Sequence, residues 1–327
     1  MRIVVIHSAD ALEPPVDPVL DQLRESLEER GHVTAFLSVG DEVEPVVAEL
    51  RAEAPDLVFN LAESFGGKSA LESNVAGLLN LLGLRYTGSS PAGLLLAGDK
   101  SLTKKVLSFH SIKTPEFATV YRGAVDWAGN ISFPVIVKPP QEDASLGIST
   151  KSVVSDLREL FTRIDELQST FQQPVLVEQF VDGREFYVGV LGNVNARALP
   201  VIELDFSGFP AGVPRIASWE AKWGDDGAGA GAQFAGTRSV FPVDLTADLL
   251  ERMKTIAVEA FHALRLRDYA RIDLRVTESE EIFVIEVNPN CYLERESEFA
   301  RAAAEDGMPY PDLIAHIVDL AVARYTR

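Results

Sequence analysis

Two alternating stretches near the C-terminus constrain the fold of this chain more than any other feature. Residues 271–276 and 282–288 carry apolar side chains at alternate positions, and five polar residues, Thr277 to Glu281, separate them. Strand-like runs joined by a short polar loop are typical of a β-hairpin. We therefore expect the two stretches to pair with each other as antiparallel strands.

The predicted hairpin gathers four polar side chains. Residues two apart in a strand point to the same face, so Arg271 lies with Asp273, and Glu286 lies with Asn288. Folding the strands together brings two carboxylates and an amide oxygen close to one guanidinium. Hard oxygen ligands of this kind suit Mg²⁺ that is held jointly with the phosphates of a substrate. The sequence therefore predicts a metal site at Asp273, Glu286 and Asn288, and phosphoryl chemistry around it.

Composition narrows the class of protein. The chain has 327 residues, 46% of them hydrophobic, which is enough for the cores of two or three domains. One cysteine and five histidines exclude a disulfide framework and argue against structural zinc. With no leader and no apolar run of ~20 residues, we expect a soluble cytoplasmic protein. The net charge of −19 argues against nucleic acid or an anionic membrane as partner.

The first 97 residues alternate between strand and helix patterns. Strand patterns at Ile3–Ile6, Val33–Leu37 and Leu57–Leu61 alternate with helical spacing at Val16–Arg30 and Leu71–Leu82. This order predicts an N-terminal α/β domain, residues 1–97, with a mostly parallel sheet. Ligands of such sheets bind at the carboxyl ends of the strands.

The loop after the third predicted strand is a candidate substrate site. It contains Glu63 and Lys68, which are suited to hold the amine or the carboxylate of an amino acid. The alternative is that both are ordinary charges of a surface loop.

The remainder of the chain mixes strands and helices and divides into two predicted parts, residues 98–182 and 183–327. Its predicted helices are Asp99–His110, Ser155–Gln168, Leu245–Leu264 and Leu313–Arg324. Residues 205–238 form a long irregular stretch, in which the segment from Gly224 to Gly236 has five glycines. A loop of this length in a compact domain is usually functional or disordered.

Two lysines are candidates for phosphate binding. Lys138 ends a short apolar strand, Pro134–Lys138, and opens a loop with the small residues Ala144, Ser145 and Gly147. An ammonium group and backbone N–H groups at such a strand end can hold a phosphate, although a solvated surface lysine is the alternative. Lys100 stands at a predicted helix start and, taken alone, indicates only an exposed helix lysine.

The segment Val175–Phe186 is an apolar strand, a turn and the start of a second strand, with acidic residues on both sides of the turn. A connector of this kind can clamp an adenine ring with apolar side chains and backbone groups, and Glu185 can accept hydrogen bonds from ribose hydroxyls. The alternative is a connector with ordinary surface acids.

Taken together, these segments resemble the ATP-grasp superfamily, and within it the D-alanine–D-alanine ligases. The order of Lys100, Lys138, the 178–185 segment and the hairpin carries the resemblance over residues 55–290. Tyr86-Thr87-Gly88-Ser89 is similar to the family's entry into its central domain, and Glu220-Ala221-Lys222-Trp223 to part of its lid loop. The resemblance implies an ATP-grasp fold behind a Rossmann-like N-terminal domain, with ATP clamped between the central and C-terminal parts and 205–238 as the lid.

The resemblance also implies a role for each residue. Arg271 would stabilise an acyl phosphate and the tetrahedral intermediate, while Lys222 would reach the transferred phosphoryl group from the lid. The metal ligands are those already predicted, binding Mg²⁺ or Mn²⁺. The residues implied in nucleotide binding are Lys100, Lys138, Ser145, Glu178, Gln179, Phe180, Val181, Glu185 and Lys222.

The sequence departs from the family on the substrate side. Residues 7–13 lack the glycine pair of the family's first-substrate segment. After the metal asparagine, Tyr292 stands where the family has glycine, although Ser297 keeps the spacing of its substrate serine. We therefore count Tyr292 and Ser297, with the 63–68 loop, as candidate substrate residues in an acceptor pocket of altered shape. Cys291 is interpreted as a small packing residue.

These observations favour an ATP- and Mg²⁺-dependent carboxylate–amine ligase that joins two small amino-acid-like molecules through an acyl phosphate. A genuine D-alanine–D-alanine ligase is the nearest alternative. A small-molecule kinase or a nucleotide-binding protein without enzymatic activity on the same fold is the alternative of another class. Because members of the family are often dimers, the resemblance also implies a homodimer.

Overall fold

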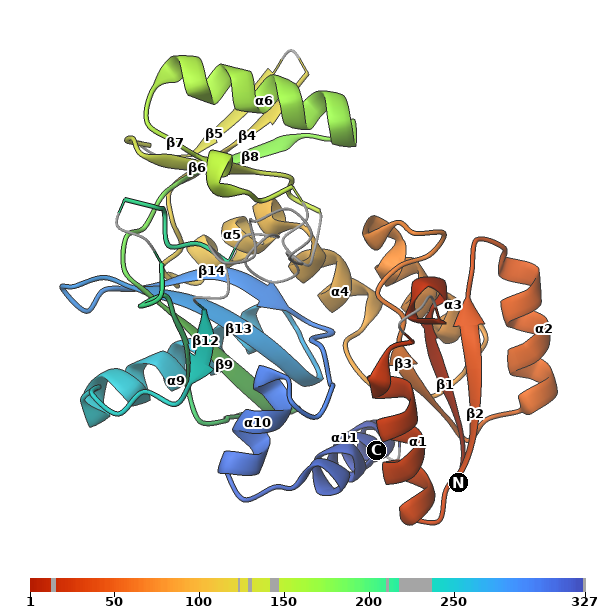
Figure 1. The fold of residues 1–327 in the computed structure, drawn as a ribbon. Coiled ribbons are helices and arrows are strands. Elements are labelled where there is room, and N and C mark those ends of the chain that lie inside the picture. The colour runs from red at the N-terminus through yellow and green to blue at the C-terminus, as the bar shows by residue number, and fades with distance from the viewer. Residues whose placement is uncertain are drawn as a thin grey trace.

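The computed structural model describes residues 1–12, 16–122, 124–128, 131–141, 147–209, 212–217 and 237–325. Their strands form three sheets, which we call the N-terminal, central and C-terminal sheets in chain order. Figure 1 shows the N-terminal sheet on one side of the molecule, with the central sheet above the C-terminal sheet on the other.

The N-terminal sheet is parallel, with strand order β2-β1-β3. Its strands are β1 (Arg2–Ser8), β2 (Val33–Val39) and β3 (Leu57–Leu61), and its helices are α1 (Pro18–Glu29), α2 (Val43–Glu53) and α3 (Glu72–Leu81). The predicted parallel α/β arrangement is confirmed. Short 3-10 helices, η1 (Ala9–Leu12) and η2 (Ser69–Leu71), follow β1 and precede α3.

Two helices lead from the N-terminal sheet toward the rest of the molecule: α4 (Pro91–Gly98) and α5 (Lys100–Phe109). The side chain of Asp99 caps α5 by accepting hydrogen bonds from the backbone N–H groups of Ser101 and Leu102, at 2.9 and 3.0 Å. A cap of this kind satisfies donors that a helix N-terminus otherwise leaves unpaired. It therefore sets where α5 begins and which side chains face inward.

The central sheet is antiparallel, with strand order β5-β4-β8-β6-β7. Its strands are β4 (Phe117–Tyr121), β5 (Ala124–Ala128), β6 (Val135–Lys138), β7 (Val153–Val154) and β8 (Val175–Gln179). The 3-10 helix η3 (Thr150–Ser152) precedes β7, and α6 (Leu157–Phe171) covers the sheet through Ile164 and Leu167 (Figure 1). This small unit forms the upper wall of the site described below.

The C-terminal sheet is also antiparallel, and its main path runs β12-β11-β9-β13-β14, with β10 beside β9. Its strands are β9 (Arg184–Gly192), β10 (Arg197–Ala198), β11 (Ile202–Asp205), β12 (Arg238–Val240), β13 (Asp268–Val276) and β14 (Ile282–Asn288). Helix α9 (Ala247–Ala263) packs on the sheet. The pairing of β13 with β14 confirms the predicted hairpin.

The last two helices are α10 (Glu298–Glu305) and α11 (Tyr310–Tyr325). Helix α11 returns to the N-terminal sheet and lies beside α1 (Figure 1). Leu23 and Leu27 of α1 share one buried cluster with Ile314 and Ile317 of α11. The C-terminal helix α11 thus contributes to the hydrophobic core that surrounds the N-terminal helix α1. The predicted divisions after residues 97 and 182 remain predictions.

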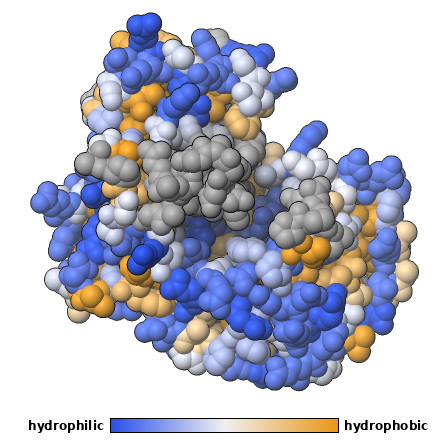
Figure 2. All heavy atoms as spheres, viewed as in Figure 1, coloured by the Kyte–Doolittle hydropathy of each residue, from blue (hydrophilic) through white to orange (hydrophobic). Residues whose placement is uncertain are grey.

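The molecular face over α1 and α10 is mainly hydrophilic (Figure 2). Among the described residues, no helix is both long enough and apolar enough to span a membrane.

Candidate active site

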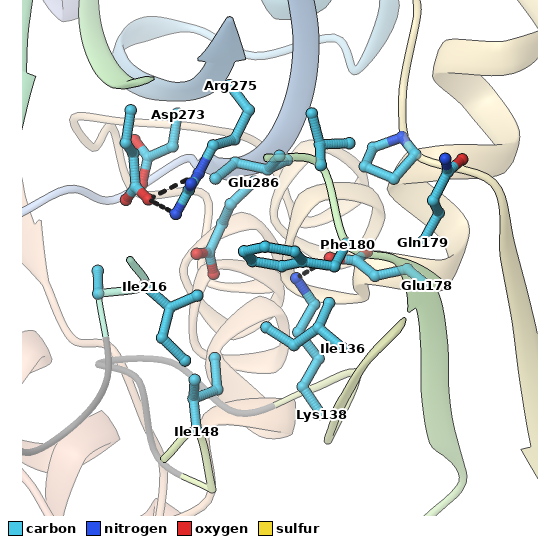
Figure 3. A pocket seen from close by; sticks show the side chains of 15 residues that line it. Ile136, Lys138, Ile148, Glu178, Gln179, Phe180, Ile216, Asp273, Arg275 and Glu286 are labelled. Atoms are coloured by element: carbon cyan, nitrogen blue, oxygen red, sulfur yellow. Dashed lines mark hydrogen bonds and ion pairs between the residues drawn. The ribbon is translucent and has the colours of Figure 1, made fainter. Parts of the chain in front are cut away.

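A pocket lies between the central and C-terminal sheets. Strands β6 and β8 supply one wall, and β9, β13 and β14 supply the other (Figure 3). The predicted site residues that line the pocket are Lys138, Glu178, Gln179, Phe180, Val181, Glu185, Asp273 and Glu286.

The hairpin places its polar residues as the sequence predicts. Arg271 pairs with Asn288 across the two strands, and Asp273 pairs with Glu286. The side-chain amide of Asn288 donates a hydrogen bond to Asp273 Oδ2 at 3.1 Å. The strand register shifts directly after Asp273, so the bulge lies beside the polar cluster. Two carboxylates and one amide therefore meet at the end of the hairpin.

Arg271 forms a bidentate ion pair with Asp273. Its Nε and Nη2 atoms lie 2.8 and 2.9 Å from the two carboxylate oxygens, and its guanidinium carbon lies 4.7 Å from the centre of the Tyr187 ring. Burial opposes the charge of Arg271, but Asp273 outweighs it, and the pKa of the guanidinium is raised well above its ordinary value. Arg271 is thus a fixed positive charge beside the carboxylates.

The donor set at the hairpin fits a magnesium ion shared with phosphate oxygens. Asp273 and Glu286 offer carboxylate oxygens, and Asn288 offers an amide oxygen, all hard ligands. Within the described ranges, no group of three or more His, Cys, Asp or Glu residues is placed to hold a metal by itself. A cation here would therefore take further ligands from a substrate, which is how Mg²⁺ usually binds beside phosphates.

Both predicted phosphate lysines are buried and paired. Lys100 is 4% exposed, and its Nζ lies 3.0 Å from Glu286 Oε1. Lys138 is 5% exposed, and its Nζ lies 2.7 Å from Glu178 Oε1. The alternative interpretation of both as solvated lysines is therefore wrong. They place positive charge on both sides of the pocket.

A third buried lysine, Lys104, was not predicted. Its Nζ lies 2.8 Å from Glu178 Oε2, so Glu178 bridges two ammonium groups. Burial opposes the charge of Glu178, but Lys104 and Lys138 together hold its pKa below the ordinary value. The sequence signal was available, because Lys104 follows Lys100 by one helical turn and shares its face.

Glu185 lies in the pocket wall with a partner that sequence analysis also missed. Its Oε2 accepts hydrogen bonds from Nε and Nη2 of Arg275 at 3.1 and 2.8 Å, and its Oε1 accepts one from the Tyr187 hydroxyl at 3.0 Å. Arg275 is two residues from Asp273 on the same strand face, which is the signal that could have identified it. The role of Glu185 toward ribose stays a prediction.

Apolar side chains complete the pocket. Ile136 and Ile148 lie near Lys138, while Phe180, Val181 and Ile216 complete this surface (Figure 3). Such surfaces suit a flat aromatic ring, whose edges need only a few polar contacts. The pocket thus combines an apolar region with a charged one.

The candidate substrate residues lie on loops outside the pocket lining. Glu63 and Lys68 are exposed after β3, and the Glu63 backbone N–H donates to Ser8 Oγ at 3.0 Å. Tyr292 donates its hydroxyl proton to Asp17 at 2.7 Å, and Ser297 donates to the Tyr292 carbonyl at 3.0 Å.

The loops that follow β3 and β14 contact each other. Asn290 donates a hydrogen bond from its side chain to the Ala62 carbonyl at 3.4 Å and accepts one from the Tyr269 hydroxyl at 2.7 Å. Cys291 is buried, and burial raises the pKa of its thiol to about 12, which suits a packing residue rather than a nucleophile. Ser145 and Lys222 lie outside the described residues.

Comparison with known proteins agrees with this geometry. Residues 106–319 match the family described as D-ala D-ala ligase C-terminus. A D-alanine–D-alanine ligase of Desulforudis audaxviator is 31% identical over 91% of each chain. An uncharacterized protein of Sinorhizobium fredii, y4sG, is 34% identical over 95% of this chain and 89% of its own length.

The fold also matches solved structures. The D-alanine–D-alanine ligase of Bacillus anthracis complexed with ATP superposes with a TM-score of 0.75 at 22% identity, covering 99% of this chain and 98% of its own. This likeness shows the ATP-grasp fold. Because the family match covers most of the chain, and full-length relatives exceed 30% identity, the protein belongs to the D-alanine–D-alanine ligase family, whose members are ATP-dependent ligases that form carbon–nitrogen bonds.

Proposed function

We propose that the protein joins the carboxylate of one small amino-acid-like molecule to the amine of another, at the expense of ATP and with Mg²⁺. The observation that carries the proposal is the convergence of separate segments on one pocket. Lys138 and Glu178 come from the central sheet, and Asp273 and Glu286 come from the hairpin of the C-terminal sheet.

The nucleotide fits this pocket with its ring against the apolar side chains and its phosphates toward the charged groups. Lys100 and Lys138 would contact the phosphates, and Glu185 would accept from the ribose hydroxyls. Asp273, Glu286 and Asn288 would hold Mg²⁺, which supplies neutralising charge to the phosphates. Ser145 and Lys222 are proposed to contact the phosphates as well.

The reaction follows from this placement. The γ-phosphoryl group passes to a carboxylate oxygen of the first substrate, which makes an acyl phosphate. The amine of the second substrate attacks the carbonyl carbon and loses a proton to solvent, the carbon–oxygen bond breaks, and phosphate leaves. Arg271, a permanent cation, stabilises the negative charge of the tetrahedral intermediate. The protein's contribution is positioning and charge stabilisation, because no covalent enzyme intermediate is needed.

The loops with Glu63, Lys68, Tyr292 and Ser297 are proposed to hold the two substrates. A genuine D-alanine–D-alanine ligase is a second candidate, because close relatives carry that name. The Tyr292 ring favours a different acceptor, since it occupies the loop where the family resemblance places glycine.

The test is phosphate release with pairs of D- and L-amino acids and small amines, followed by product mass. We expect ADP and phosphate only when both substrates are present, and a product with the summed mass less one water. Turnover with D-alanine alone would select the second candidate. A stable phosphorylated product would indicate a kinase, and ATP binding without turnover for any pair would indicate a non-enzymatic protein.

A further inference from the structure

Helix α5 carries two buried lysines, one turn apart, that reach both walls of the pocket. Lys100 pairs with Glu286 on β14 of the C-terminal sheet, at 3.0 Å. Lys104 pairs with Glu178 on β8 of the central sheet, at 2.8 Å. The helix thus delivers one positive charge to each wall.

Lys104 lies behind the pocket wall. It is 1% exposed and is not among the residues that line the pocket. Its Nζ donates to Thr114 Oγ1 at 2.8 Å and lies 6.0 Å from the centre of the Phe117 ring. An ammonium group in this position does not touch a ligand in the pocket. Any effect on a ligand must act through Glu178.

The charges around Glu178 add up to one net positive charge. Its two carboxylate oxygens face two lysines, Lys138 at 2.7 Å and Lys104 at 2.8 Å. Lys138 lines the pocket, where the nucleotide phosphates are proposed to bind. Without Lys104, the pair of Lys138 and Glu178 would be neutral as a whole.

We propose that Lys104 is a positioning residue for ATP. From the side of Glu178 that faces away from the pocket, Lys104 offsets the negative charge of this carboxylate and orients it. Glu178 then does not cancel the attraction of the Lys138 ammonium for a phosphate of the nucleotide. The inference rests on the proposed function, because it requires that this pocket bind ATP.

The titration of Lys104 agrees with this role. Burial lowers its pKa to about 8, with Lys138 acting in the same direction and Glu178 in opposition. The charged groups that face it are Glu178 on β8, Lys138 on β6 and, farther away, Glu286 on β14. Below pH 8 the Lys104–Glu178–Lys138 cluster carries one net positive charge, and above pH 8 it loses that charge.

The test compares binding of ATP with binding of adenosine, which lacks the phosphates. Lys104→Met should weaken ATP binding on the order of tenfold and leave adenosine binding unchanged, because it removes one charge near the phosphates. The double variant Lys104→Met with Glu178→Gln again leaves one net positive charge in this cluster, on Lys138. It should therefore restore the wild-type ratio of ATP affinity to adenosine affinity. Lys105→Met, on the exposed face of the same helix, is the matched control and should equal the wild type.

Equal weakening of ATP and adenosine binding, or no change in either, would overturn the inference. If Lys104→Met does not fold, a pH series with the wild type replaces it. Affinity for ATP should fall between pH 7 and 9 while adenosine affinity stays constant, and the double variant should lose this dependence. If the ATP affinity of the wild type does not change with pH, this inference is overturned, but the proposed function is not. A wild type that binds no ATP at all would overturn the proposed function as well.

Discussion

The acidic residues of the pocket each have a cationic partner. Asp273 faces Arg271, Glu286 faces Lys100, and Glu178 faces two lysines. For the buried Glu178, the two lysines outweigh the effect of burial and hold the pKa of the carboxyl below its ordinary value. The pocket therefore contains paired opposite charges. Its carboxylates are suited to bind a metal ion, and its cationic side chains are suited to bind phosphates.

Glu286 is the residue on which the metal proposal depends most. Glu286→Gln removes one carboxylate ligand and leaves Lys100 facing a neutral amide, so we expect turnover to fall by about a hundredfold or more. The measurement is phosphate release with the best substrate pair. Glu281→Gln is the control, because Glu281 lies on the same hairpin in an exposed pair with Lys113. Unchanged turnover in Glu286→Gln would remove Glu286 from the metal site.

The placement of the hairpin residues was predictable because a strand's two-residue period determines which side chains share a face. Lys104 and Arg275 were not identified, although both have the right spacing on their own elements. Their partners, Glu178 and Glu185, belong to strands far away in the chain. Local patterns indicate which face a charge lies on, but not which opposite charge it meets.

Among the elements, helix α5 is held at its start by hydrogen bonds that also fix the position of Lys100. Its N-cap, Asp99, also accepts a hydrogen bond from the Gln141 side chain at 3.0 Å, and the Lys100 backbone N–H donates to the Pro140 carbonyl at 2.9 Å. The start of α5 is thus tied to the loop that follows Lys138. Both proposed phosphate lysines depend on this junction.

Asp99→Ala tests the junction. Loss of the cap should lower the free energy of unfolding by about 0.5–2 kcal/mol and raise the KM for ATP, because the first turn of α5 carries Lys100. The matched control is Asp156→Ala, which removes an equivalent cap from α6, away from the pocket. It should cost similar stability and leave the KM for ATP unchanged. Equal KM values for ATP in the two variants would show that the α5 cap does not affect nucleotide binding.

The loop after β14 is proposed to set the acceptor. Tyr292→Gly removes the ring and its hydrogen bond to Asp17, and we expect phosphate release with D-alanine as sole substrate to increase relative to wild type. Tyr292→Phe removes only the hydroxyl and serves as the control. A substrate preference identical in all three proteins would show that Tyr292 does not shape the acceptor site.

Elements with a clear polar and apolar face were predictable, as for α1, α6 and α9. Helices α4 and α10, each of eight residues, were missed; α4 is apolar on nearly every side, so its sequence has no polar face that marks a helical period. Short elements without a periodic pattern are formed by their surroundings rather than by local preference. Residues 210–211 and 218–236 of the 205–238 stretch, including Lys222, lie outside the described residues.

At the scale of the whole molecule, one carboxylate joins the first, last and middle parts of the chain. Asp268 is fully buried at the start of β13, and it accepts hydrogen bonds from Nε and Nη2 of Arg324 at 2.9 and 2.7 Å. It also accepts from the Gly88 backbone N–H at 2.8 Å and from the Asn193 side chain at 3.1 Å. The terminal helix is thereby attached to the C-terminal sheet as well as to α1.

Arg324→Met should destabilise the molecule by about 3–5 kcal/mol, because it leaves the buried Asp268 carboxylate without its countercharge. Urea unfolding measures the effect. Arg197→Met is the control, since Arg197 pairs with Asp306 at the surface, where such pairs contribute about 0–1 kcal/mol. Similar losses in both variants would contradict the role assigned to Asp268.

The arrangement of the three sheets followed from family resemblance rather than from periodicity. The spacing of apolar residues predicted α11 as a helix, but nothing in its own sequence indicated that it would pack beside α1. That contact joins the two ends of the chain, so it depends on the whole fold.

The most direct test of the account uses a substrate whose carboxylate is labelled with ¹⁸O. If ATP phosphorylates that carboxylate and an amine then displaces phosphate, one labelled oxygen moves from the acid into the released phosphate for each amide formed. Mass spectrometry of the phosphate should show this single label. Release of unlabelled phosphate, with or without a new amide, would contradict the proposed acyl phosphate route.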